Sequence, residues 1–306
     1  MKYHQNHSLR EFNTFQIEAR ADHFYQFDTP EELQDWLKQN PGRSDVLVLG
    51  GGSNILFTGD YSGTILYPVF KGKEIIEEKG DDVWVRIAAG EDWDRCVEWA
   101  VNNDLWGLEN LSLIPGHAGA APVQNIGAYG VEISELVEWV EGLWLKDGKA
   151  FCMTQRECDY GYRYSIFKGP FRNQAVVTSV VLKLSRKPVY RLNYGTLENV
   201  VTQMGGPALN NIRQAVMQIR YEKLPDPRVT GNAGSFFKNP VVEKAFYDEL
   251  QSEWPAIPGY LLNNGTHVKV PAGWLIEQVG WKGKILGNAG VHFAQALLLI
   301  NRGGAT

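Results

Sequence analysis

The sequence reads VLVLGGGSN from Val46 to Asn54. Four apolar residues predict a short buried strand, and three glycines follow it directly. Glycines after a strand let successive backbone N–H groups converge on an anion, and Ser53 and Asn54 add further donors. A diphosphate would fit such a turn, but an ordinary tight turn has the same composition. The stretch matches neither GxGxxG nor GxxxxGK[ST], so a phosphate site here is of neither the Rossmann nor the P-loop type.

Around this stretch, helices and strands mix without a regular strand–helix–strand repeat, which indicates an α+β fold. Thr29, Pro30 and two glutamates predict the start of a helix that runs to about Lys38. The pattern also predicts strands at 83–87, 137–145, 150–153, 175–184 and 296–300, and helices from about 92 and at 154–157, 210–221, 242–250 and 274–279. The segment Leu224-Pro225-Asp226-Pro227 breaks the helix before it and predicts a domain boundary.

The composition excludes several classes of protein. The 306 residues include 30 basic and 35 acidic side chains, and a net charge of −5 argues against a broad nucleic-acid footprint. Apolar runs fall short of the roughly 18 residues of a membrane span, and the start has no signal-peptide pattern. The three cysteines form no CxxC pair, and the six histidines show no ligand spacing, so we expect neither disulfides nor a metal site. We therefore expect a cytoplasmic protein that binds a ligand or cofactor.

A long irregular segment of small residues is the second candidate site. It runs from Gly107 to Gly130 and contains PGHAGAAPVQNIGAYG from Pro115. Such a segment inside a compact protein is usually functional. Small residues permit backbone contact with a flat ring system, while Gln124 and Asn125 can pair with ring heteroatoms. A buried connector would have the same composition, so both interpretations stay open.

Two further segments each contain one residue suited to chemistry. Arg163 lies in GYRYS, and its planar guanidinium suits a carboxylate or phosphate. Ser235 lies in GNAGSFFKNP and offers an unhindered hydroxyl, although the GxSxG pattern of serine hydrolases is absent. A surface or cation–π arginine, and a tight loop anchored by phenylalanine, are the alternatives.

Taken together, these segments resemble the UDP-N-acetylenolpyruvoylglucosamine reductase family, flavoenzymes that make UDP-N-acetylmuramate for peptidoglycan. The matching motifs lie in order along nearly the whole chain. They include GGGSNILF, GLENLSLIPG, APVQNIGAYG, GYRYSIFK, LPDP, GNAGSFFKNP, AGWLIEQ and QALLLIN. Leu192 to Gly195 resembles the substrate-covering loop of the subclass that carries a tyrosine there.

The resemblance implies an α+β fold with an FAD-binding domain of the vanillyl-alcohol-oxidase type. Its two subdomains would span 1–71 and 72–224, and an α+β substrate-binding domain would span 225–306. In this family NADPH reduces FAD, the reduced flavin N5 delivers hydride to C3 of the enolpyruvyl ether, and a serine protonates C2. The partners implied are UDP-N-acetylenolpyruvoylglucosamine and NADPH, with no nucleic acid or membrane, and we expect a monomer.

The resemblance also assigns residues. Ser235 is implied as the proton donor, and Arg163 as the group that stabilises the enolate. The implied substrate residues are Tyr194, Arg220, Lys223, Asn239 and Gln295. The implied FAD residues are Gly50, Gly51, Gly52, Ser53, Asn54, Pro115, Gly119, Ala120, Ala121, Gln124, Asn125, Ile126, Gly127 and Tyr129.

The sequence departs from the family pattern in two places. The family continues beyond the position of Thr306 with a Leu-Glu-Pro-Glu-Val-Arg motif, whose second glutamate is catalytic. We therefore expect a shortened chain in which NADPH still reduces the flavin but substrate reoxidises it poorly. His117 is bulky for a flavin-facing wall; its ring could turn away, and it receives no role.

Two competing interpretations of the sequence stay open. One is a covalent flavin oxidase of the same fold, and the other is a flavin- or UDP-sugar-binding protein without catalysis.

Overall fold

The computed structural model describes residues 1–262 and 265–306. By their contacts, these residues form two compact units, each described here by itself. Unit 1 comprises Met1–Leu9, Ala19–Gly52 and Gly59–Glu222. Unit 2 comprises Arg10–Glu18, Ser53–Thr58 and Lys223–Thr306. The three-part division expected from the sequence stays a prediction.

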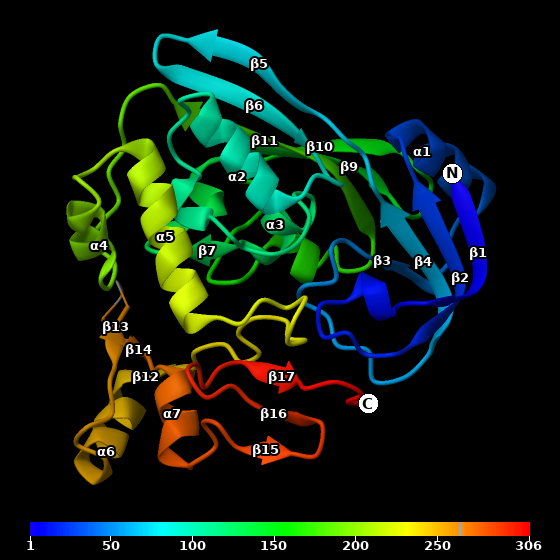
Figure 1. Cartoon of the computed structure of the whole chain (residues 1–306). Coiled ribbons are helices and arrows are strands. Elements are labelled where there is room, and N and C mark those ends of the chain that lie inside the picture. The colour runs from blue at the N-terminus through cyan, green and yellow to red at the C-terminus, as the bar shows by residue number, and fades with distance from the viewer. Residues whose placement is uncertain (263–264) are drawn as a thin grey trace. The chain divides into compact units, whose positions relative to one another are not determined.

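The first sheet of unit 1 has four strands in the order β1-β2-β4-β3 (Figure 1). Its strands are β1 (Lys2–Ser8), β2 (Arg20–Phe27), β3 (Val46–Val48) and β4 (Tyr61–Pro68). β1 pairs antiparallel with β2, whereas β4 runs parallel to β2 and to β3. The predicted helix is α1 (Pro30–Gln39), which buries Leu33 and Leu37 in one core with this sheet. Thr29 caps α1 because its hydroxyl accepts a hydrogen bond from the backbone N–H of Glu32, at 3.3 Å.

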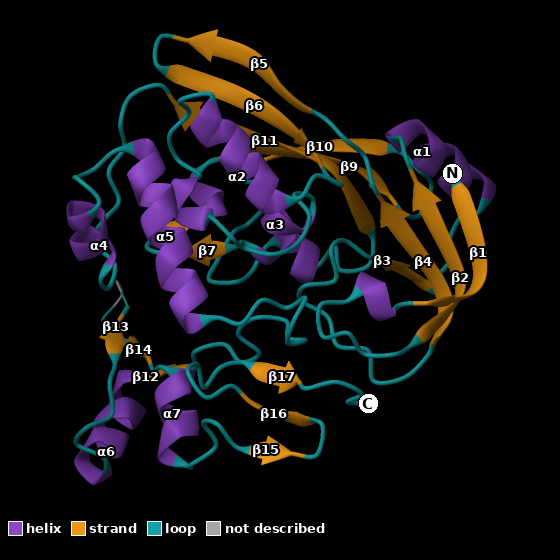
Figure 2. Ribbon diagram, in the orientation of Figure 1, coloured by secondary structure: helices purple, strands orange, loops and turns teal. Residues whose placement is uncertain are grey.

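The second sheet of unit 1 is antiparallel, with five strands in the order β10-β9-β11-β6-β5. Its strands are β5 (Lys73–Lys79), β6 (Asp82–Ala88), β9 (Val137–Trp144), β10 (Ala150–Thr154) and β11 (Ala175–Ser185). α2 (Trp93–Asn102) lies over β6 and β11, as Figure 2 shows, and buries the face that the sequence predicts. Asp92 caps α2 by accepting a hydrogen bond from the backbone N–H of Arg95, at 3.0 Å.

The rest of unit 1 is mainly short elements and two helices. α4 (Leu197–Gln203) and α5 (Leu209–Lys223, whose last residue belongs to unit 2) form a separate small core with Trp106. The irregular segment from Gly107 contains the short helices η2 (Glu109–Leu111) and α3 (Ala120–Gln124). The remaining pieces are β7 (Gly127–Ala128), β8 (Val131–Glu132), η3 (Ile133–Glu135) and η4 (Ile166–Lys168).

Unit 2 contains two small sheets, in the strand orders β12-β14-β13 and β15-β16-β17. The first comprises β12 (Val241–Glu243), β13 (Tyr260–Leu261) and β14 (His267–Lys269). The second comprises β15 (Ile285–Leu286), β16 (Ala289–Val291) and β17 (Leu299–Asn301). The helices are η1 (Arg10–Phe12), α6 (Lys244–Glu253) and α7 (Ala272–Gln278). The described helices of the chain include none that is both long and apolar enough to cross a bilayer.

Three predicted elements differ from the structure. Thr154 and Glu157 make the expected capping hydrogen bonds, but Asp159 takes φ +46° and ends a single turn there instead of a helix. The predicted helix at 242–250 begins only at Lys244, because Val241–Glu243 pairs with β14. The predicted strand at 296–300 begins only at Leu299, because a turn closes when the N–H of Leu298 bonds to the carbonyl of Gln295, at 3.1 Å.

Candidate active site

The glycine turn after β3 packs directly against the predicted loop from Pro115. A Cβ added to Gly51 would lie 2.8 Å from Gly116 Cα, so only glycine permits this approach of two backbones. Gly52 takes a left-handed backbone angle of φ +62°, which changes the direction of the chain after this contact. The turn spans the division of the chain, because Gly50, Gly51 and Gly52 belong to unit 1 while Ser53 and Asn54 belong to unit 2. Within unit 1, two segments far apart in the sequence therefore meet.

A cavity of about 180 Å³ lies beside this contact. Gly50 lines it from the turn, and His117, Gly119 and Ala120 line it from the second segment. The other lining residues are mostly apolar. They are Val46, Leu47, Val48, Leu49, Pro68, Ala89, Val123, Leu145, Phe167, Phe171, Asn173, Ala175 and Val177. An apolar pocket with a few polar groups at its rim is typical of a cofactor site.

Backbone hydrogen bonds hold the second segment in place. The N–H of Gly119 donates to the carbonyl of Ala89 at 2.9 Å, and an added Cβ on Gly119 would lie 2.6 Å from Ala89 Cβ. Asn125 ends α3 with φ +47° and is fully buried. Its side-chain amide donates to Glu132 and to the carbonyl of Gly161, each at 2.9 Å, and its oxygen accepts from the N–H of Ser134. The side chain of Asn125 therefore fixes the loop from within, and its backbone N–H donates to the carbonyl of Ala121.

Arg163 lies against the carbonyls of the same loop. It occupies the third position of a turn from Gly161 to Tyr164, with φ +53°. Its guanidinium donates to the carbonyl of Asn125 at 3.1 Å and to that of Gly127 at 2.5 Å. These bonds use two of its five N–H donors. The side chain is 27% exposed, so Arg163 is oriented by the loop and still accessible.

Tyr129 is the centre of a second group of candidates in unit 1. Its ring lies 5.9 Å from that of Tyr194 in an edge-on arrangement, and Tyr194 is 57% exposed. Asn110 donates hydrogen bonds to the carbonyls of Tyr129 and Arg191, each at 2.8 Å. Burial raises the pKa of the Tyr129 phenol, and the Arg220 cation opposes that shift. The predicted substrate residues Tyr194 and Arg220 are thus brought to the predicted flavin loop.

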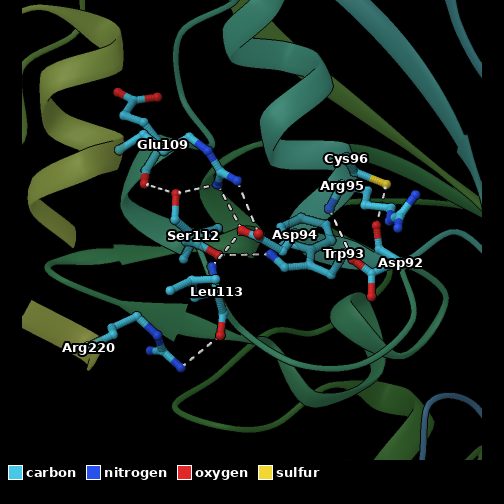
Figure 3. Close-up of polar contacts among 11 residues, drawn as sticks. Asp92, Trp93, Asp94, Arg95, Cys96, Glu109, Ser112, Leu113 and Arg220 are labelled. Carbon is cyan, nitrogen blue, oxygen red and sulfur yellow. Dashed lines mark hydrogen bonds and ion pairs between the residues drawn. The ribbon is translucent and has the colours of Figure 1, made fainter. Parts of the chain in front are cut away.

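A buried ion pair holds Arg220 and its surroundings (Figure 3). Arg213 of α5 binds Asp94 of α2 through both carboxylate oxygens, at 2.7 and 3.0 Å. Asp94 also accepts the N–H of Leu113 at 2.6 Å, and the carbonyl of Leu113 accepts from Arg220 at 3.0 Å. Burial opposes ionisation of Asp94, but Arg213 and the N–H of Leu113 outweigh it and hold the pKa of this carboxyl below its ordinary value. The sequence does not predict this network, since no local motif connects residues more than 100 positions apart.

In unit 2, Ser235 lies on a short extended segment. Ser235 pairs with Leu298, and the N–H of Phe236 donates to the carbonyl of Leu297 at 2.9 Å. Before it, Gly234 takes φ +67°, and its N–H donates to the side chain of Asn232 at 3.1 Å. Ser235 itself is exposed. The glycines of this motif therefore shape a turn that presents a serine on a fixed backbone.

The other predicted residues of unit 2 lie near this segment or at the end of α5. Gln295 ends the turn that precedes Leu298, and its side-chain oxygen accepts from the N–H of Leu297 at 3.4 Å. The Asn239 side chain accepts the N–H of Ala272 at 3.0 Å, where α7 begins. A Cβ added to Gly273, the residue after Ala272, would lie 3.9 Å from the side-chain oxygen of Gln295. Asn239, which contacts Ala272, therefore lies near Gln295, and Ser235 pairs with Leu298, three positions after Gln295. Lys223 is exposed at the end of α5.

Features of unit 1 fit FAD. The cavity offers apolar walls, the Gly50 turn lies at its edge, and the buried Nδ1 of His117 has no hydrogen-bond partner among the described residues. His117 is among the residues that line the cavity, and the interpretation in which its ring turns away from the flavin stays a prediction. Lys168, for which the sequence predicts no role, also contacts the loop from Pro115, because its ammonium donates to Gln124 at 2.6 Å and to the carbonyl of Arg163 at 3.0 Å.

Comparisons with known proteins point to one family. Residues 21–152 match an FAD binding domain, and residues 226–306 match the C-terminal domain of UDP-N-acetylenolpyruvoylglucosamine reductase. The chain is 48% identical to the UDP-N-acetylenolpyruvoylglucosamine reductase of Bacteroides fragilis over 98% of its own length and 90% of that protein. It is 44% identical to the enzyme of the same name from Flavobacterium johnsoniae over 100% of its own length and 91% of that protein.

The fold is also similar to a solved structure. A crystal structure of UDP-N-acetylenolpyruvylglucosamine reductase from Thermus caldophilus matches with a TM-score of 0.67 and 24% identity. The match covers 99% of this chain and 89% of that chain. The shared fold, together with the match of residues 21–152 to an FAD binding domain, confirms the predicted fold class, an α+β chain with an FAD-binding domain.

Proposed function

The chain belongs to the UDP-N-acetylenolpyruvoylglucosamine reductase family, flavoproteins of peptidoglycan precursor synthesis, and we propose that Arg163 and Ser235 carry the chemistry in this chain. FAD, when bound, supplies to the enolpyruvyl group a hydride that originates from NADPH. The protein residues then have two tasks, which are to stabilise negative charge next to the substrate carboxylate and to deliver one proton.

Arg163 is proposed to stabilise the enolate. Hydride addition next to a carboxylate builds up negative charge on the carboxylate oxygens, and a fixed guanidinium stabilises that charge without reorganisation. The observation that carries this role is the pair of hydrogen bonds from Arg163 to the carbonyls of Asn125 and Gly127. They orient the planar group before substrate arrives. Glu132 lies 3.8 Å from the same guanidinium and tempers its charge.

Ser235 is proposed to donate the proton to C2 of the substrate. A serine hydroxyl is a weak acid in water, so donation depends on geometry, a nearby cation and a strongly basic acceptor carbon. The backbone pairing of Ser235 with Leu298 supports this role because it fixes the position from which the hydroxyl acts. The general-acid contribution of such a group is about 10²- to 10⁴-fold in rate.

Substrate binding is proposed for Tyr194, Arg220, Lys223, Asn239 and Gln295. The substrate carries a diphosphate, whereas the protein has a net charge of −5, so local cations must supply the attraction. Arg220 and Lys223 are three positions apart on α5, a spacing that places side chains on the same face of a helix. A monomeric state, a cytoplasmic location and the tyrosine-loop subclass also remain predictions.

The test replaces Ser235 with alanine in the FAD-loaded protein. We expect NADPH to bleach the flavin absorption of S235A at the wild-type rate, because that step needs no proton from the serine. Recovery of the absorption on addition of UDP-N-acetylenolpyruvoylglucosamine should slow by at least about 100-fold. Both rates are measured in a stopped-flow spectrophotometer.

The matched control is Ser252→Ala, which changes an exposed serine at the end of α6. Both of its rates should equal those of the wild type. If the flavin of S235A recovers its absorption as fast as that of the wild type, Ser235 is not the proton donor.

A further inference from the structure

Lys168 of unit 1 joins two segments that surround Arg163. It is the last residue of η4, and its side chain is half-buried. Its ammonium donates to the side-chain oxygen of Gln124 at 2.6 Å and to the backbone carbonyl of Arg163 at 3.0 Å. Hydrogen bonds from a charged donor are stronger than those between neutral groups. One side chain therefore ties the turn that carries Arg163 to the end of α3.

The backbone of Arg163 needs support from its surroundings. With φ +53°, Arg163 adopts the left-handed conformation, which is unfavourable for residues other than glycine. Such a conformation persists only where the surrounding structure holds it. Two backbone hydrogen bonds between Gly161 and Tyr164, at 3.0 and 3.1 Å, close the turn around Arg163. Lys168 holds the carbonyl of Arg163 itself, which is a group that any change of this conformation would move.

The same lysine also supports the segment against which the guanidinium rests. Arg163 donates to the carbonyl of Asn125, and Gln124 directly precedes Asn125 in the chain. The contacts therefore form a closed ring, which runs from the guanidinium of Arg163 through Asn125, Gln124 and Lys168 back to the carbonyl of Arg163. A shift of either segment would stretch a hydrogen bond to Lys168. Both the backbone and the side chain of Arg163 are thus fixed with the help of one ammonium group.

We propose that Lys168 is a positioning residue for Arg163 and sets the place of its guanidinium before substrate arrives. This inference rests on the proposed role of Arg163 in stabilising the enolate. A guanidinium stabilises developing charge without reorganisation only when its place is already fixed. Lys168 acts through the backbone of Arg163 and through Gln124, so its effect on the reaction depends on the presence of the guanidinium.

The experiment is a double-mutant cycle on the FAD-loaded, full-length protein. The variants are Lys168→Met, Arg163→Met and the combination of both, because methionine keeps an unbranched apolar stem without an N–H donor. Each protein is reduced by NADPH without oxygen and mixed with saturating UDP-N-acetylenolpyruvoylglucosamine in a stopped-flow spectrophotometer. The return of the flavin absorption in K168M should be about 10- to 100-fold slower than in the wild type, since the guanidinium loses its fixed place.

Three readouts separate positioning from a merely structural role. In the R163M background, Lys168→Met should cause no further slowing, because no guanidinium is left to position. Bleaching of the flavin by NADPH should keep the wild-type rate in K168M, since that step builds up no enolate. The dissociation constant of the substrate, measured by calorimetry on the oxidised holoprotein, needs no turnover. It should rise in K168M but should not rise further when Lys168→Met is added to R163M.

The matched control is Lys149→Met, which changes a lysine of unit 1 whose side chain is 80% exposed, and it should behave as the wild type. The proposal is overturned if K168M reacts with substrate as fast as the wild type. It is also overturned if Lys168→Met slows the reaction equally with and without Arg163, or slows the NADPH step to the same extent. Failure of the proposed function gives a different result, in which R163M itself binds and reacts with substrate as the wild type does.

Discussion

Gly127 leaves little room around the proposed catalytic arginine. A Cβ added there would lie 2.8 Å from a terminal nitrogen of Arg163, 3.0 Å from Glu132 Cγ and 3.0 Å from the carbonyl oxygen of Val131. Gly127→Ala should therefore displace the guanidinium from its two carbonyl partners. Because a misplacement of about 1 Å can reduce a rate by two orders of magnitude, we expect kcat to fall by about 10- to 100-fold. Steady-state kinetics give kcat and KM separately, and the visible absorbance gives the FAD content.

The matched control is Gly161→Ala, in the turn that carries Arg163. Its added Cβ would make only ordinary contacts, at 3.8 Å or more, with the ring of Tyr164 and its Cβ. The control should keep kcat close to that of the wild type. A G127A enzyme that turns over at the wild-type rate would show that Arg163 does not need its carbonyl partners.

At this scale, the sequence predicts which residue types matter better than it predicts their surroundings. Arg163 and Ser235 stand out in unusual motifs, and the resemblance to the family assigns their roles. The pattern did not show that the Asn125 side chain is used within the protein, because its partner Gly161 is 36 positions away. Nor did it show that His117 lines the cavity, since that depends on the packing of Gly51 against Gly116.

Among the elements, α2 and α5 are tied together by a buried ion pair. Arg213 is 5% exposed, and both of its terminal nitrogens contact Asp94. Removing one partner of a buried pair leaves the other charge uncompensated, which costs about 3–5 kcal/mol. This pair also holds Leu113, whose φ of +57° is unusual for a residue other than glycine. Through Leu113 it fixes one partner of Arg220.

Asp94→Asn should lower the free energy of unfolding by about 3 kcal/mol at neutral pH, measured by urea denaturation. The pKa of Asp94 is depressed in the folded state, so its stabilisation is fully present above the unfolded value of about 3.9 and is lost as the pH falls through the lower folded value. The difference between wild type and D94N should therefore shrink toward acid pH, where the aspartate is protonated. A difference that stays constant from neutral to acid pH would contradict the ionic character of this contact.

Elements with a strong local signal were predicted well. The capping residue Thr29 and the two glutamates of the first turn correctly predicted α1, and the spacing of apolar residues correctly predicted the buried face of α2. The expected helix after Thr154 fails because the left-handed φ of Asp159 ends it. The expected capping hydrogen bond between Thr154 and Glu157 does form, but a single capped turn is too short to propagate a helix.

For the whole molecule, the two units carry complementary parts of the proposed chemistry. Unit 1 contains the cavity, the loop and Arg163, whereas unit 2 contains Ser235, Asn239 and Gln295. The resemblance to the family predicted the FAD-binding fold, and the comparisons confirm it. Pairing between distant segments, such as Ser235 with Leu298, could not be read from either segment alone, because each is too short to predict its partner.

The most direct test of the central claim is a stopped-flow experiment on the FAD-loaded wild-type protein. NADPH is added first, without oxygen, and UDP-N-acetylenolpyruvoylglucosamine second, while the visible flavin absorption is followed. We predict that the absorption disappears with NADPH and returns with the substrate. A protein that takes up no FAD, or whose flavin is not bleached by NADPH, would contradict the account.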